Sequence, residues 1–215
     1  MKAILMSLML VAGTTLSAQL ETGNILINVD YEMGFGYSQS GSIDGEDIPD
    51  EVFDMSDVSS GLVRVDAQYQ VADAISAGLV GRFGSFTTSY DDADLDDDKT
   101  NVTEVGVEAR YSLVNTESIN VFVGPSFGIS NTKADEIPSG EDEDDYKTSG
   151  TFYQIAAGGQ FFLNELFGLN LRVGYGGHSG KQDLDSFDDQ GNETTVEAKS
   201  SLSGIEVGFG VSVKL

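Results

Sequence analysis

The segment from Ile25 to Tyr37 reads I-L-I-N-V-D-Y-E-M-G-F-G-Y, with a large apolar residue at every odd-numbered position. From Asn28 onward its even-numbered positions hold only Asn, Asp, Glu and Gly. Side chains alternate between the two faces of a β-strand, so one face of this segment favours hydrocarbon and the other favours water or counter-charges. The same parity recurs in seven further segments, which predicts an all-β chain with one apolar and one polar surface.

The period of two predicts eight strands. They cover residues 25–37, 61–71, 75–90, 102–114, 118–131, 149–163, 166–180 and 200–215. Most of them contain the roughly 9 to 11 residues that a tilted strand needs to cross a membrane. Odd-numbered positions carry most of the apolar side chains, whereas Gly, Ser, Asn, Gln and charged residues occupy most even-numbered positions.

The connections between these segments alternate between short and long. The tight turns are 72–74, 115–117 and 164–165, and the long connections are 38–60, 91–101, 132–148 and 181–199. Short periplasmic turns and long extracellular loops are typical of outer-membrane barrels, whereas a soluble sandwich has no reason to segregate its loops by length. We therefore predict an eight-stranded antiparallel up-and-down transmembrane β-barrel.

Aromatic residues at odd-numbered strand positions form two predicted belts. The turn-end belt contains Tyr69, Tyr111, Phe161 and Phe167, and the loop-end belt contains Phe35, Tyr37, Phe83, Phe127, Tyr153 and Tyr175. Aromatic residues gather at both interfaces of a membrane, so we expect all ten side chains to face lipid.

Residues 1–18 have the pattern of a secretory signal peptide. Lys2 precedes an apolar run from Ala3 to Gly13, and small residues lead to a predicted cleavage point after Ala18. The apolar run is too short to span a bilayer. We therefore assign residues 1–18 to a signal peptide and residues 19–215 to one barrel domain, which contains no cysteine and hence no disulfide.

Ionisable residues at even-numbered strand positions are predicted to face the lumen. They are Asp30, Glu32, Arg64, Asp66, Arg82, Glu104, Glu108, Arg110, Arg172, Glu206 and Lys214. An eight-stranded barrel is just wide enough for its own side chains, and buried charges are costly unless they are paired. We expect an ion-pair network that fills the lumen, with an open pore as the alternative.

The formal net charge of −25 argues against nucleic acid as a partner. The four long connections hold 26 of the 36 acidic residues, so the predicted extracellular loops are acidic. Carboxylates in such loops could bind Ca²⁺ or Mg²⁺, and the candidate ligands are Asp92, Asp94, Asp96, Asp98, Asp142 and Asp144. The run at 92–98 lacks the Gly and the final Glu of a calcium-binding loop. The alternatives to a metal site are that the acidic loops are simply solvated or that they form a surface for a basic protein. We expect no other cofactor.

In these features the chain resembles the small eight-stranded outer-membrane barrels of the OmpA/OmpX-like family. Members commonly end in Phe, whereas this chain ends in Leu215, so recognition by the barrel-insertion machinery would rest on Ile205, Phe209, Val213 and Leu215. The resemblance implies a monomeric, multi-pass protein in the outer membrane of a Gram-negative bacterium, in contact with outer-membrane lipid and lipopolysaccharide.

The single histidine, His178, is followed by Ser179. Adjacent strand residues point to opposite faces, so the two cannot act together as base and nucleophile. The lipid A deacylase barrels that the chain resembles in size have His and Ser two positions apart, a spacing absent here. We expect a non-enzymatic protein that displays acidic loops for envelope integrity or surface interaction. The alternatives are a narrow porin-like channel and a lipid- or peptide-directed hydrolase, in which His178 would pair with Asp183 or Asp185.

Overall fold

The computed structural model describes residues 20–49, 56–90, 96–135, 147–187 and 193–215. The predicted signal peptide therefore lies outside the described residues. Among the described residues, no helix is long and apolar enough to cross a membrane.

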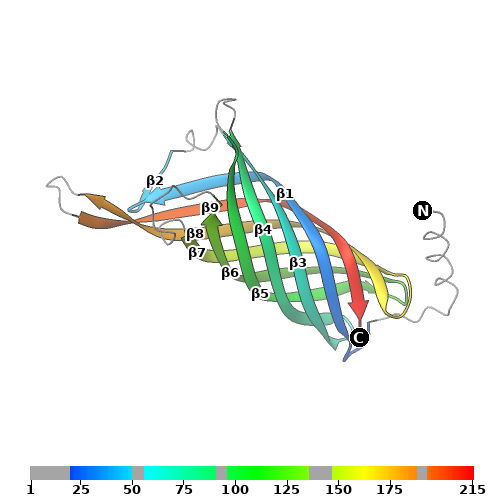
Figure 1. The fold of residues 1–215 in the computed structure, drawn as a ribbon. Coiled ribbons are helices and arrows are strands. Elements are labelled where there is room, and N and C mark those ends of the chain that lie inside the picture. The colour runs from blue at the N-terminus through cyan, green and yellow to red at the C-terminus, as the bar shows by residue number, and fades with distance from the viewer. Residues whose placement is uncertain (1–19, 50–55, 91–95, 136–146, 188–192) are drawn as a thin grey trace.

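The described residues form nine strands. They are β1 (Ile25–Ile43), β2 (Glu46–Asp47), β3 (Ser56–Ala72), β4 (Ile75–Tyr90), β5 (Asp98–Asn115), β6 (Ile119–Ala134), β7 (Lys147–Phe162), β8 (Phe167–Phe187) and β9 (Glu193–Lys214). The two-residue strand β2 pairs with the end of β1, and the other eight strands pair antiparallel in sequence order (Figure 1). Pairing of β1 with β9 closes the ring, which confirms the predicted eight-stranded up-and-down barrel.

The barrel wall is apolar outside and polar inside. Leu79 and Leu171 on the outer surface are 65% and 62% exposed, whereas Arg64 and Arg82 in the lumen are 0% exposed. Soluble proteins keep Arg at the surface and large apolar side chains inside. The reversed distribution matches a barrel whose outer surface contacts hydrocarbon, so the parity assigned from the sequence holds over most of the wall.

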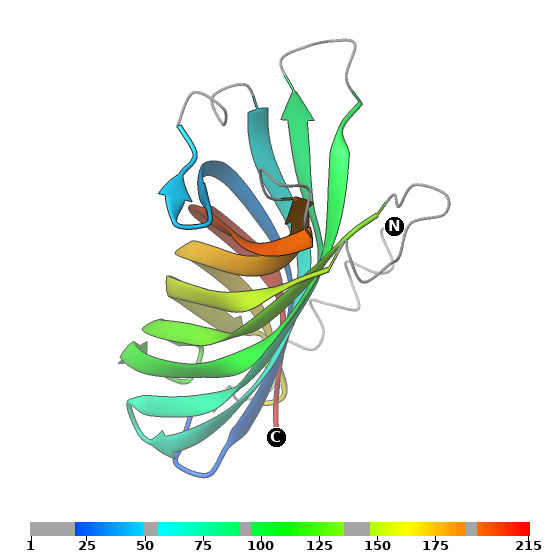
Figure 2. The same cartoon turned by 90° about the vertical axis from the view of Figure 1, so that its left-hand side faces the viewer.

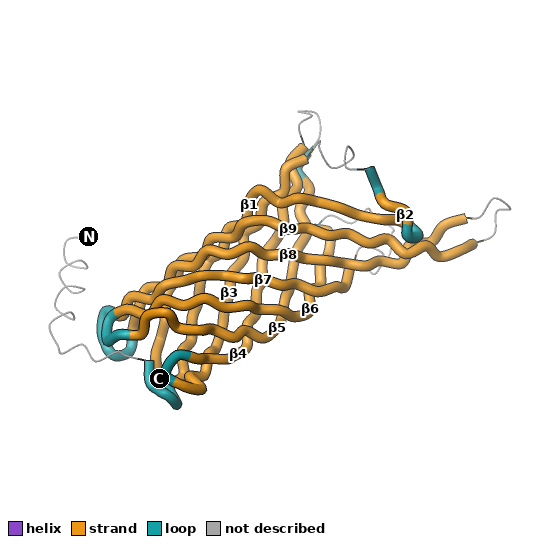
Figure 3. Tube along the Cα trace, turned by 180° about the vertical axis from the view of Figure 1, so that it is seen from behind, coloured by secondary structure: helices purple, strands orange, loops and turns teal. Residues whose placement is uncertain are grey.

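The tight turns lie together at one end of the barrel, beside the C-terminus (Figure 3). At the opposite end the strands continue further than the sequence predicted. β1 reaches Ile43, β5 begins at Asp98, β8 continues to Phe187 and β9 begins at Glu193. The two strands of each hairpin keep hydrogen bonding to each other beyond the apolar zone, so parts of the predicted loops are strand. We call the two ends of the barrel the turn end and the loop end.

Tyr37 is the exception among the predicted lipid-facing aromatic residues, because it points into the lumen. The register between β1 and β9 shifts between Phe35 and Ser38, and Gly36 at the shift has a φ of 62°. A bulge adds one residue to a strand, and a one-residue shift moves the following side chains to the other face. Inside the barrel, the Tyr37 hydroxyl lies 2.9 Å from Ser60 Oγ and donates to Glu206 at 3.1 Å. The prediction that Tyr37 faces lipid is therefore wrong.

The wall divides at the loop end. The ladder between β1 and β3 runs from the Ile25–Tyr69 pair to the Gly34–Ser60 pair. Beyond it, β1 continues beside β9, and β3 continues beside β4. Figures 1 and 2 show the two groups of strands diverging toward the loop end. The closed part of the barrel therefore lies between this division and the turns.

Candidate functional site

The lumen is filled by layers of side chains. An apolar cluster of Leu20, Leu26 and Phe162 lies at the turn end. At the loop end, Val58, Leu62, Phe86 and Val102 form a second apolar cluster, with Tyr37 and Leu202 packed against it. Between these two layers lie buried charged and amide side chains, which form two ion clusters.

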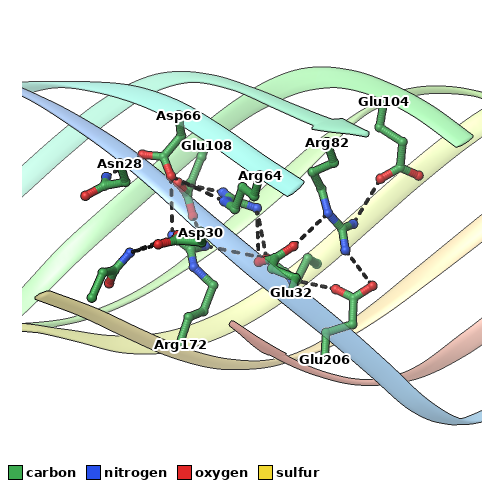
Figure 4. A network of polar contacts seen from close by, with 12 residues as sticks. Asn28, Asp30, Glu32, Arg64, Asp66, Arg82, Glu104, Glu108, Arg172 and Glu206 are labelled. Atoms are coloured by element: carbon green, nitrogen blue, oxygen red, sulfur yellow. Dashed lines mark hydrogen bonds and ion pairs between the residues drawn. The ribbon is translucent and has the colours of Figure 1, made fainter. Parts of the chain in front are cut away.

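The loop-side ion cluster consists of Glu32, Arg82, Glu104, His178 and Glu206. Arg82 is at its centre and directs each guanidinium nitrogen at a different carboxylate (Figure 4). The distances are 2.9 Å to Glu32, 3.0 Å to Glu104 and 2.6 Å to Glu206. Charge-assisted contacts of this length are among the strongest hydrogen bonds in proteins. One buried arginine therefore holds together carboxylates from β1, β5 and β9.

His178 contacts two of the same carboxylates as Arg82. Its Nδ1 lies 2.6 Å from Glu104 Oε1, and its Nε2 lies 3.3 Å from Glu206 Oε1. An ionised carboxylate can only accept hydrogen bonds, so both ring nitrogens donate when both glutamates are ionised. With both glutamates ionised, the arrangement therefore favours the imidazolium form of His178. The ring is also 4.8 Å from the Phe86 ring, in an edge-on contact.

The turn-side ion cluster consists of Arg64, Asp66, Glu108, Arg110 and Arg172. Glu108 lies 2.9 Å from Arg64 Nη2 and 2.6 Å from Arg110 Nη2, and Arg172 Nη1 is also in contact with it. Asp66 lies 2.8 Å from Arg110 Nη2. The Phe122 ring supports two of these guanidinium groups, at 4.5 Å from Arg110 and 5.3 Å from Arg172.

Buried amides complete the turn-side layer. Asn170 Nδ2 donates to both carboxylate oxygens of Asp30 at 2.9 Å. Asn28 Nδ2 donates to Asp66 at 2.6 Å, and Gln160 Nε2 donates to Asn28 at 2.9 Å. Buried polar groups are costly without partners. Asn28 and Asn170 give the carboxylates donors that the arginines do not supply, and Gln160 in turn donates to Asn28.

Ten of the eleven ionisable residues predicted to face the lumen are buried there. Lys214, the eleventh, is half-buried at the end of β9. The structure adds His178 and Tyr37 to the lumen, together with the amides. His178 has an even number, so the alternation along its strand is sufficient to predict that it faces the lumen. The register shift that turns Tyr37 inward has only Gly36 as a cue in the sequence.

The candidate metal ligands are not brought together in the described part of the chain. Asp92, Asp94, Asp142 and Asp144 lie outside the described residues, and Asp96 and Asp98 are exposed. Asp98 accepts a hydrogen bond of 2.6 Å from Tyr90, which raises the pKa of that phenol. Within the described ranges, no three acidic or histidine side chains converge as metal ligands would.

An open cup of about 280 Å³ lies above the loop-side apolar cluster. Its wall carries the hydroxyl groups of Thr88, Thr100, Ser130, Thr132, Thr148 and Ser200, and its floor contains Phe86, His178 and Leu202. Ser179 does not supply a nucleophile to His178, since its hydroxyl lies 3.0 Å from Thr151 on the outer face. The cup offers hydrogen bonds to small polar molecules, and the packed layers separate it from the turn end.

Comparison with solved structures identifies the fold. OprG, an outer membrane protein from Pseudomonas aeruginosa, is 15% identical, with a TM-score of 0.62 over 92% of this chain and 98% of that one. Neisserial surface protein A is 12% identical, with a TM-score of 0.49 over 90% and 99% of the two chains. The outer membrane protease OmpT from Escherichia coli is 9% identical, with a TM-score of 0.45 over 95% and 100%. No family model and no curated protein matches the sequence. The likeness to OprG shows a shared barrel fold.

Proposed function

We propose that this chain, which has the OmpA/OmpX-like outer-membrane barrel fold, is a non-enzymatic protein of the Gram-negative outer membrane. It is exported by its signal peptide, contacts outer-membrane lipid and lipopolysaccharide, and holds acidic loops at the cell surface for envelope integrity or surface interaction. The observation that carries the proposal is the inverted wall, with large apolar side chains exposed outside and charged side chains buried inside. Such an outer surface is stable in hydrocarbon and prone to aggregation in water.

The filled lumen argues for a rigid scaffold rather than a channel. Arg64, Arg82 and Glu104 are 0% exposed, and the ion clusters lie between two apolar layers. A hydrated ion would have to displace several ion pairs together to cross this stack.

Planar-bilayer recordings test this view. The folded protein should give no steady conductance steps under conditions in which a large porin conducts. Reproducible ion-selective steps that scale with the amount of inserted barrel would replace the scaffold by a narrow channel.

The lumen also argues against a hydrolase. His178 is 8% exposed and both of its ring nitrogens face glutamates, while Ser179 points to the outer face. The side chains of Asp183 and Asp185, the partners considered for His178, lie outside those that the structure describes. Among the side chains that it does describe, neither His178 nor Ser179 has a partner arranged for nucleophilic catalysis.

Mass spectrometry of lipid A tests this conclusion. Cells that express the protein and cells that carry the empty vector should yield the same acylation pattern. Loss of an acyl chain that depends on His178 would establish an enzyme.

A further inference from the structure

The cup at the loop end is lined by hydroxyl groups from five strands. They belong to even-numbered, inward-facing residues on β4, β5, β6, β7 and β9: Thr88, Thr100, Ser130, Thr132, Thr148 and Ser200. Val58, Phe86 and Leu202 add an apolar surface at the base of the cup. The cup therefore combines a ring of hydrogen-bonding groups with a hydrocarbon floor.

The lining of the cup is uncharged. Among the residues that the structure describes, it contains no Asp, Glu, Lys or Arg. His178 lies in the floor, and both of its ring nitrogens contact glutamates. A cation would find no carboxylate in this lining, and an anion would face the three glutamates of the ion cluster below the floor. A charged ligand would lose its hydration without gaining a counter-ion, so the cup favours an uncharged ligand.

The hydroxyl lining favours a ligand that both donates and accepts hydrogen bonds. Each Ser or Thr hydroxyl can do both, and it rotates to suit its partner. An ionised carboxylate only accepts and an ammonium group only donates, so either would use half of this capacity. The hydroxyl groups of a sugar do both. They surround a pyranose ring whose C–H groups form apolar patches, which would suit Phe86 and Leu202 in the floor.

Ser130 has a hydroxyl group without a partner in this wall. The residue is 4% exposed, and its Oγ makes no hydrogen bond to any residue that the structure describes. The residues opposite it are Glu104 on β5 and Gly150 on β7. Glu104 directs its two oxygens at His178 and Arg82, and Gly150 has no side chain. Because a buried hydroxyl without a partner is costly, a molecule in the cup that bonds to Ser130 would gain affinity.

Two more hydroxyl groups of the cup are held only by long hydrogen bonds. Thr132 donates to the carbonyl oxygen of Thr148 at 3.5 Å, and the Thr148 hydroxyl donates to Gln182 at 3.3 Å. Hydrogen bonds from hydroxyl donors usually span roughly 2.5–3.0 Å, so both bonds are weak. A ligand hydroxyl can replace them at little cost.

The volume of the cup limits the ligand to about one sugar ring. At about 280 Å³ it lies just below the roughly 300–1,000 Å³ of pockets that enclose drug-sized molecules. The cup is open, so a longer glycan would enter it with its terminal residue only.

We infer that the cup binds one uncharged pyranose ring, either as a free sugar or as the terminal residue of a glycan. This inference gives a ligand class to the surface interaction of the proposed function. It rests on that function for the exposure of the cup at the cell surface.

The test is saturation-transfer NMR on the full chain, folded in a detergent without a sugar headgroup. The probes are the methyl pyranosides of glucose, galactose and mannose, with glucuronate as the anionic and glucosamine as the cationic comparison. At least one methyl pyranoside should bind, and both charged sugars should bind at least about 10-fold more weakly. Displacement of the bound pyranoside by dextran, galactan or mannan, the polymers of these sugars, would assign the glycan source, and lack of displacement would assign a free sugar.

The test variant removes four hydroxyl groups of the cup with little change in shape: Thr100→Val, Ser130→Ala, Thr132→Val and Thr148→Val. The matched control makes the same kinds of change at odd-numbered, outward-facing positions: Thr87→Val, Ser89→Ala, Thr103→Val and Thr151→Val. The cup variant should lose affinity at least about 10-fold, because several hydrogen bonds of modest individual strength are lost together. The control should bind like the wild type. Ser200→Phe fills the cup from an exposed position and should abolish binding.

The inference is overturned if no methyl pyranoside binds, if a charged sugar binds more tightly, if the control loses as much affinity as the cup variant, or if the cup variant and Ser200→Phe bind like the wild type. An unboiled gel separates lost binding from lost folding, and Ser200→Phe decides the question if the quadruple variant does not fold. Membrane fractionation of cells expressing the wild-type chain tests the proposed location separately. A protein found outside the outer membrane refutes the proposed function, whereas the NMR measurement in detergent still reports on the cup.

Discussion

Replacement of Arg82 by Met should destabilise the barrel more than any other single change in the lumen. Arg82 is 0% exposed and contacts Glu32, Glu104 and Glu206 at 2.9, 3.0 and 2.6 Å. Met has a similar length and fills much of the space, so the change removes charge and hydrogen bonds more than volume. Among the described residues, Glu104 and Glu206 then keep only His178 as an ion-pair partner, and Glu32 keeps only the longer contact of 3.8 Å with Arg64.

The magnitude follows from the three contacts. Each pair contributes about 4 kcal/mol at a charge separation of about 4 Å and an effective dielectric constant of about 20. The desolvation of the ions offsets much of that total. The loss is also limited because a stranded glutamate can take up a proton, which costs about 4 kcal/mol at pH 7 for an ordinary pKa near 4.3. We expect the free energy of unfolding to fall by about 3–5 kcal/mol, the usual result of breaking a buried ion pair.

The assay is urea unfolding of the protein in lipid vesicles, with the folded fraction read from unboiled gels because the chain has no Trp. Arg64→Met is the matched control. Arg64 shares Glu108 and Asp66 with Arg110 and Arg172, and it shares Glu32 with Arg82. Its removal therefore leaves all three carboxylates paired and should cost at least about 1 kcal/mol less. Equal losses for the two variants, or a loss below about 1 kcal/mol for Arg82→Met, would refute this account of the loop-side cluster.

Three further outcomes are expected. His178→Phe removes the two ring contacts with Glu104 and Glu206, so the free energy of unfolding should fall by about 1–3 kcal/mol. An unchanged urea midpoint would contradict a role of both ring nitrogens in stability. Hydrogen bonds from Lys199 and Lys181 lower the pKa of Glu197. The stability that Glu197 contributes is therefore present above its unfolded-state pKa and is lost as the pH falls through its folded-state pKa. Lys199→Gln should raise the pKa of Glu197 in a carboxyl NMR titration, and an unchanged pKa would exclude the contact in solution. Calcium should bind the loops no tighter than millimolar by calorimetry, and tighter binding that disappears when residues 91–98 are neutralised would establish a metal site.

The fold was predictable because a barrel wall obeys one rule at every position. Side-chain alternation from Ile25 onward is sufficient to assign Arg82 and Glu206 to the interior without any knowledge of their contacts. The rule places Tyr37 on the wrong face because it counts residues, and one extra residue in a bulge reverses the count. The rule also misses the strand ends, because beyond the apolar zone strands such as β8 and β9 continue through hydrogen bonding to each other. That pairing leaves no hydrophobic pattern in the sequence.

The pairing of particular ions was not predictable. The sequence places six acids and their bases inside, but their partners depend on how far adjacent strands are displaced along the wall. His178 illustrates this, because its two glutamates come from β5 and β9, at 74 and 28 residues' separation. A local sequence pattern therefore carries no information on which partners a lumen residue contacts when those partners are far away in the sequence.

The closure of β1 against β9 has a consequence for the assembly of the chain. Leu26 pairs with Lys214, so the contact that completes the ring joins residues from the two ends of the barrel sequence. Closing so large a loop is entropically unfavourable, and contacts distant in sequence form slowly. Until β9 is in position, β1 and β8 each present an open edge of unpaired peptide groups, which is a template for pairing with other chains. A chain shortened by its final strand should therefore form a seven-stranded open sheet that aggregates, instead of a narrower barrel.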